Sequence, residues 1–144
     1  MDDIIAYNVQ LFVDCSVVRW HAPSIIGHNA TNSGNLSMIK VCILYPNIAG
    51  GRFDFDYYLS KHMPRSIELL SAHPGFRGVT VERGIGGTEP NSPPKYIAAC
   101  FFTFGAIESF IAAFMPHANE LQGDMQHYTN IPTEIQFNEI LIEK

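Results

Sequence analysis

Residues 50–64 read GGRFDFDYYLSKHMP, and this stretch predicts how the middle of the chain folds. The glycine pair permits a tight turn, and Asp54 supplies a side-chain oxygen suited to capping a helix N-terminus. Helical spacing then places four side chains on one face: Phe55, Tyr58, Leu59 and His62. Pro64 predicts a break, because its ring clashes with the preceding helical turn. The stretch therefore predicts an imidazole held at a helix break and aimed toward an apolar cavity.

The sequence on either side of this stretch predicts four strands and a second helix. Runs rich in β-branched and aromatic residues predict strands at Ile39–Tyr45, Phe76–Arg83, Tyr96–Phe104 and Thr133–Ile142. The first helix is expected to resume after its break and to reach about residue 72, and the second to start after residue 105, with an interruption at Pro116. The order βαββαβ is that of an α+β, ferredoxin-like fold with a four-stranded antiparallel sheet.

The predicted sheet is apolar on both faces. Two helices cover only one face of such a sheet, and the other face normally carries polar residues. Strand Tyr96–Phe104, however, reads YIAACFFTF, and strand Ile39–Tyr45 is also apolar on both sides. Burying a single Phe or Leu contributes about 1.5–3 kcal/mol, so a lone subunit would leave a costly apolar patch in water. We therefore expect a homodimer that pairs through these sheet faces as a dimeric α/β barrel, with room for a small ligand between sheet and helices.

Residues 1–37 differ from the rest of the chain. Tyr7–Val18 alternates as a strand does, and residues 22–37 have the Asn, Ser, Gly and Thr content of a loop. Two interpretations remain open. Residues 1–37 are an N-terminal extension attached to a domain at 38–144, which we favour, or Tyr7–Val18 adds an edge strand to the sheet.

Composition narrows the class of protein. The net charge of −5 and the pI near 5.6 argue against a nucleic-acid-binding protein, which needs a basic face. No apolar run approaches the ~20 residues that span a bilayer, and Asp2 and Asp3 stand where a signal peptide would be basic. The three cysteines are far apart and form no disulfide framework. We expect a cytoplasmic protein without a nucleic-acid or membrane partner.

A second set of polar residues repeats the pattern of the first. If the second helix continues past Gly123, one face carries His117, Leu121, Asp124 and Tyr128. An imidazole near a carboxylate suits general acid–base chemistry near neutral pH, and a phenol can donate to a developing oxyanion. The catalytic candidates are therefore His62, His117 and Asp124. The candidate substrate-binding residues are Tyr58, Leu121 and Tyr128.

Each candidate also fits an ordinary structural role, and both interpretations stay open. His62 fits a helix cap that donates to a terminal carbonyl, and His117 fits the first residue of a helical turn. Asp124 fits an N-cap, while Tyr58 and Tyr128 fit the core with their hydroxyls reaching water.

Metal and nucleotide cofactors are not expected. His62, His117, His127 and Asp124 include suitable ligand types, but none shows a compact spacing such as HxxxH or HExxH. The glycines at 84–87 lack the following helix that a phosphate-binding loop requires.

Three runs of sequence resemble the EthD family, named after a component of bacterial ethyl tert-butyl ether degradation. They are MIKVCILYPN at 38–47, GGRFDFDYYLSKHMP at 50–64 and FMPHANELQGDMQHYTNIPTEIQ at 114–136. The resemblance covers residues 38–143 and implies the dimeric α/β barrel, with a cleft lined by His62, His117, Asp124 and Tyr128. Related dimeric barrels include cofactor-free quinone-forming monooxygenases and muconolactone isomerases, and some fungal EthD-like domains are associated with polyketide dehydration.

These inferences lead to one expected function and one alternative. We expect a cytoplasmic homodimer whose cleft binds a small, largely apolar or aromatic molecule of a catabolic pathway. Isomerisation, dehydration or cofactor-free oxygenation would suit such a cleft. The alternative is a non-catalytic binding or accessory protein of a degradation pathway. A third hypothesis, a purely structural oligomerisation module, has less support in the sequence than either of these.

Overall fold

The structure, a computed structural model, describes residues 38–144. Its elements are β1 (Ile39–Pro46), α2 (Phe55–Tyr57), η2 (Tyr58–His62), α3 (Met63–Ser71), β2 (Phe76–Arg83), β3 (Tyr96–Phe104), α4 (Ile107–Phe114), η3 (Met115–His117), α5 (Ala118–Asp124), η4 (Met125–His127) and β4 (Glu134–Glu139). The predicted extension at 1–37, with its possible strand Tyr7–Val18, lies outside the described residues. No helix of residues 38–144 combines the length and the apolar character that crossing a membrane requires.

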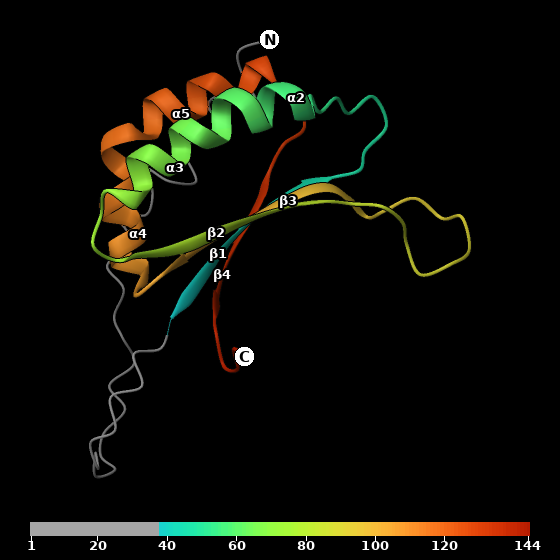
Figure 1. Cartoon of the computed structure of the whole chain (residues 1–144). Helices are drawn as coiled ribbons and strands as arrows, with labels where there is room; N and C mark the ends of the chain where they lie inside the picture. Colours follow the sequence, from blue (N-terminus) through green and yellow to red (C-terminus); the bar gives the residue numbers. More distant parts are fainter. Residues whose placement is uncertain (1–37) are drawn as a thin grey trace. The chain divides into compact units, whose positions relative to one another are not determined.

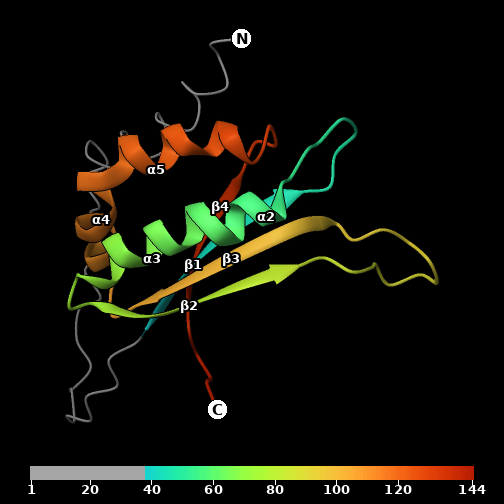
Figure 2. The same ribbon diagram turned by 45° about the horizontal axis from the view of Figure 1, so that its top comes forward.

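The four strands form one antiparallel sheet in the order β2-β3-β1-β4. The helical segments lie together on one side of this sheet (Figures 1 and 2). The predicted α+β, ferredoxin-like βαββαβ fold is therefore confirmed. The last strand is shorter than predicted and runs from Glu134 to Glu139 rather than to Ile142, although the Ile140 N–H still donates to the Met38 carbonyl at 2.8 Å.

The core fills the space between the helices and the facing side of the sheet. Alternate residues of the two central strands point into it, including Val41, Tyr45 and Phe104, which are almost completely buried. Tyr58 and Phe110 pack against them from the two helical segments. The fully buried aromatic side chains named here therefore lie between the layers of the described part of the chain, residues 38–144.

The opposite face of the sheet has an apolar centre and polar borders. In the central strands, Cys42 lies opposite Phe101. The edge strands place Gln136 beside Cys42 and Thr80 beside Phe101, so that polar side chains border the apolar stripe. The predicted apolar character of this face therefore holds for β1 and β3 only, and pairing of two chains through it stays a prediction.

The first helical segment is not broken at His62–Pro64, contrary to the prediction. The π-helical turn η2 joins α2 to α3 without interruption, and the Met63 N–H donates to the Tyr58 carbonyl. Pro64 falls in the first turn of α3, and the wider π turn before it relieves the clash that an ordinary helix would suffer.

The buried face of this helical segment differs from the predicted face at one residue, Leu59. Tyr58 and His62 are buried as predicted, whereas Leu59 is 51% exposed. The buried face continues from His62 to Ser66 and Leu70 in steps of four residues, and Leu59 lies about 100° around the helix from Tyr58.

Candidate functional site

His62 and Asp124 meet where the two helical segments lie side by side. Asp54 caps the first segment, because its side chain accepts a hydrogen bond from the Tyr57 N–H at 3.0 Å, as the sequence predicts. His62 ends the π turn of that segment, and Asp124 is the last residue of α5 in the second. The helical segments thus bring together two side chains that are 62 positions apart in the chain.

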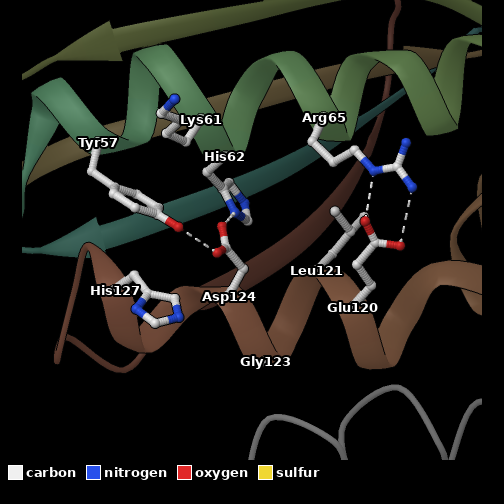
Figure 3. Close-up of a pocket in the computed structure, with 9 residues that line it drawn as sticks. All are labelled: Tyr57, Lys61, His62, Arg65, Glu120, Leu121, Gly123, Asp124 and His127. Atoms are coloured by element: carbon white, nitrogen blue, oxygen red, sulfur yellow. Dashed lines mark hydrogen bonds and ion pairs between the residues drawn. The ribbon is translucent and has the colours of Figure 1, made fainter.

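Asp124 is held by two donors. The His62 Nδ1 lies 2.8 Å from Asp124 Oδ2, and the Tyr57 hydroxyl donates to Asp124 Oδ1 at 2.8 Å. Figure 3 shows both side chains reaching from the first segment toward the carboxylate. His62 is only 10% exposed as a side chain, while Asp124 is 27% exposed.

Sequence reasoning missed Tyr57. In an ordinary helix, a residue five positions before His62 points well away from it. A π turn instead brings residues five apart nearly above one another, so Tyr57 and His62 reach the same carboxylate. Two tyrosines in succession, at 57 and 58, are the sequence feature that could have pointed to Tyr57 as a site residue. Helical spacing of the α type, however, places only Tyr58 on the same face as His62.

His62 is neutral near neutral pH. Burial lowers the pKa of its imidazole, and the hydrogen bond and charge of Asp124 only partly oppose this effect. An ionised Asp124 can only accept hydrogen bonds, which assigns the ring proton to His62 Nδ1. The Nε2 atom is then an acceptor, and the Tyr128 hydroxyl lies 3.5 Å from it.

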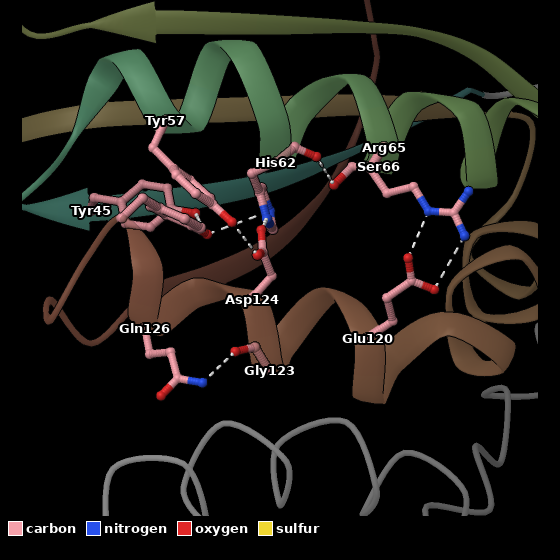
Figure 4. A network of polar contacts seen from close by, with 10 residues as sticks. Tyr45, Tyr57, His62, Arg65, Ser66, Glu120, Gly123, Asp124 and Gln126 are labelled. Carbon is pink, nitrogen blue, oxygen red and sulfur yellow. Dashed lines mark hydrogen bonds and ion pairs between the residues drawn. The ribbon is translucent and has the colours of Figure 1, made fainter.

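A network of buried phenols continues beneath His62. The Tyr128 and Tyr45 hydroxyls are 3.0 Å apart, and the Tyr58 ring stacks on the His62 ring with centroids 5.4 Å apart. Figure 4 shows Tyr45 and His62 within this network of polar contacts. Burial raises the pKa of Tyr58 and Tyr128 well above the usual value of a phenol. These hydroxyls therefore remain protonated hydrogen-bonding groups.

A pocket of about 320 Å³ opens between the two helical segments. Its lining is drawn in Figure 3 and consists of Tyr57, Lys61, His62, Arg65, Glu120, Leu121, Gly123, Asp124 and His127. All nine residues belong to helical segments, so this pocket differs from the predicted cleft between sheet and helices.

The predicted site residues divide between the pocket and other places. His62, Leu121 and Asp124 line the pocket, whereas Tyr58 and Tyr128 lie in the core under His62. His117 lies in η3, partly buried and outside the lining of this pocket.

An ion pair bridges the two segments at the other end of the pocket. Arg65 Nε donates to Glu120 Oε1 at 2.6 Å, and Arg65 also pairs with Glu68 at 2.9 Å. These side chains are about half exposed or more, so their contribution to stability is small. Their contact nevertheless orients the charged groups on both walls.

In residues 38–144 the possible metal ligands form no cluster, and the two cysteines are buried. No group of three or more His, Cys, Asp or Glu side chains in this part of the chain is arranged to hold a metal ion. Cys42 and Cys100 are free and buried, and burial raises the pKa of the Cys100 thiol to about 12. Such a thiol stays protonated and is a poor nucleophile.

Two solved structures resemble this chain over most of their length. An EthD-like protein from Ralstonia eutropha is 37% identical, with a TM-score of 0.70, and the match covers 75% of this chain and 96% of that one. An ethyl tert-butyl ether D (EthD) family protein from Bacillus halodurans is 24% identical, with a TM-score of 0.52, and the match covers 72% of this chain and 99% of that one. The second likeness shows the shared fold. No family model and no curated protein matches the sequence.

Proposed function

The chain belongs to the EthD family, and from that premise we propose that it binds a small, largely apolar organic molecule in the pocket beside His62 and Asp124. On this ligand it carries out cofactor-free acid–base chemistry of the isomerase, dehydratase or monooxygenase type. We further propose that this reaction belongs to a catabolic pathway, an idea that the family name, ethyl tert-butyl ether D, supports.

The observation that carries this proposal is the 2.8 Å contact between His62 and Asp124 at the wall of the pocket. A buried imidazole with a shifted pKa beside a carboxylate is a common composition of acid–base sites. Leu121 adds an apolar surface to the same pocket, which suits a largely apolar ligand.

One observation favours the alternative, a non-catalytic binding or accessory protein of a degradation pathway. Both His62 ring nitrogens lie near protein groups, Asp124 at 2.8 Å and Tyr128 at 3.5 Å. Without movement, neither nitrogen is free to take a proton from a ligand. Turnover of a bound compound would distinguish the enzyme from the non-catalytic binding protein.

We also propose that the protein works as a cytoplasmic homodimer paired through the outer face of its sheet, and that residues 1–37 are an extension of the EthD-like domain. The apolar stripe of β1 and β3 with its polar border supports the first part, because interfaces commonly have an apolar core and a polar rim.

A ligand screen followed by substitution tests the proposed function. The full-length protein is screened against small aromatic and oxygenated compounds by NMR, and bound compounds are incubated with the protein and analysed for conversion. We expect His62→Ala to abolish conversion and His73→Ala, a histidine outside the lining of this pocket, to leave it within about twofold. Conversion unaffected by His62→Ala, or ligands that never perturb pocket residues, would refute the proposal.

A further inference from the structure

We propose that Asp124, rather than His62, is the group in this pocket that contacts the ligand, and that the ligand is a small hydroxylated aromatic molecule whose O–H donates to the carboxylate. This inference rests on the proposed function of the pocket. It assigns a ligand class and makes His62 and Tyr57 positioning residues.

The surroundings of His62 leave little access to its ring. Tyr58 stacks on the ring at 17° between planes, and the Tyr128 ring lies 4.6 Å away between centroids. Asp124 occupies the Nδ1 side, and Nε2 faces the buried Tyr128 hydroxyl. A ligand in the pocket therefore meets the carboxylate before it meets either ring nitrogen.

Asp124 is both held in place and accessible. Each of its oxygens accepts one hydrogen bond from the protein, from Tyr57 and His62 respectively. A carboxylate oxygen has two lone pairs, so each oxygen keeps a second acceptor position. With 27% of the side chain exposed at the pocket, these positions can accept from a ligand.

The residues that line the pocket indicate which kind of hydrogen-bond donor the ligand carries. An ionised carboxylate recognises a donor, and a hydroxyl provides one without adding charge. The Tyr57 and His127 rings lie 5.6 Å apart at 33° on one side of the pocket, and Leu121 adds an apolar surface. These two rings and the leucine side chain suit an aromatic ring that carries the hydroxyl, although most other residues of the lining are polar or charged.

The same arrangement allows a balanced proton transfer. The ligand O–H bond breaks, an O–H bond forms on Asp124, and the electron pair stays on the ligand oxygen. The negative charge moves from Asp124 to the ligand oxygen.

A matched pair of probes tests the proposal on the full-length protein. 4-Nitrophenol, kept below its own pKa, carries the hydroxyl, and its methyl ether 4-nitroanisole lacks it. We expect 4-nitrophenol to bind about tenfold or more tightly than the ether and to perturb the NMR signals of Tyr57 and Leu121. Asp124→Ala should bring the ratio of affinities close to one, and Asp124→Leu, which also lacks an acceptor, serves if the alanine variant does not fold.

Variants of His62 test its positioning role. His62→Asn keeps an N–H donor near the place of Nδ1 and should retain most of the preference for the phenol, whereas His62→Ala should reduce it. In the unmodified protein, the ¹⁵N shifts of His62 should show a protonated Nδ1, and Asp124→Asn should change them.

The outcomes separate this inference from the proposed function. A preference for 4-nitrophenol that survives Asp124→Ala, with pocket signals still perturbed, overturns the role of Asp124 but leaves a ligand-binding pocket. Equal affinity for the two probes, or no perturbation of pocket signals, overturns the ligand class. If other compounds then bind and are converted, the proposed function still stands.

Discussion

Replacing the buried tyrosine hydroxyls tests whether the network beneath His62 stabilises the fold. The perturbation is Tyr128→Phe, Tyr45→Phe and the two together, each of which removes only an oxygen atom. Tyr128 is 0% exposed and Tyr45 is 2% exposed, and their hydroxyls are 3.0 Å apart. Neither hydroxyl can exchange its partner for bulk water without a structural change.

The expected magnitude follows from this burial. Tyr128→Phe takes away the 3.0 Å partner of Tyr45 and the group that faces His62 Nε2. Loss of a partner at a buried polar group costs about 1–3 kcal/mol, so we expect about 2 kcal/mol for this variant. The double variant should cost less than the sum of the single variants, with a coupling of about 1 kcal/mol, because the second substitution removes a hydroxyl that already lacks its partner.

Urea unfolding followed by far-ultraviolet circular dichroism at pH 7.5 measures the free energies of unfolding. Tyr96→Phe is the matched control, since its hydroxyl makes an exposed hydrogen bond to Glu134 at 3.0 Å, and we expect a cost below about 0.5 kcal/mol. Additive effects of Tyr45→Phe and Tyr128→Phe, or costs no larger than that of the control, would refute the reasoning.

Three further predictions address the site, the assembly and the N-terminal segment. The lowered pKa of His62 means that the unfolded chain binds its proton more readily, so stability is present above pH 6.5 and falls as the pH drops from 6.5 toward the folded pKa. His62→Gln should flatten this part of the stability–pH curve, and an unchanged curve would show that another group titrates. Light scattering should give twice the 16.1 kDa chain mass, and Phe101→Glu on the outer sheet face should give one chain mass; a monomeric unmodified protein at micromolar concentration contradicts the dimer. Deletion of residues 1–37 should leave the Tm nearly unchanged, and a large drop would mean that Tyr7–Val18 belongs to the sheet.

The strands could be predicted because their signals are local. Phe76–Arg83 and Tyr96–Phe104 have the bounds that their composition predicts, and the turn residues around them end the runs. The N-cap at Asp54 is equally local, since it depends on residues three positions apart. The order of these elements then limits the topology to few arrangements, among them the ferredoxin-like one observed.

The path of the first helical segment could not be predicted from the sequence as accurately as the strands. The α-helical spacing of residues 55–62 and the proline at 64 predict an ordinary helix that breaks at Pro64. An ordinary turn and a π turn differ by a single hydrogen-bond shift, and the choice depends on what the segment packs against. Here the π turn allows Tyr58 and His62 to stay in the core while the helix continues past the proline.

The amino-acid sequence by itself determined the βαββαβ order, the apolar central strands and the two helical segments that carry His62 and Asp124. Only the tertiary structure decided that Tyr57 joins them, that Tyr58 and Tyr128 are core residues, and that the pocket lies between the helices. The reason is distance along the chain. Strand alternation and helix caps depend on neighbouring residues, whereas the Tyr57–Asp124 bond joins residues 67 positions apart and exists only because two helices pack side by side.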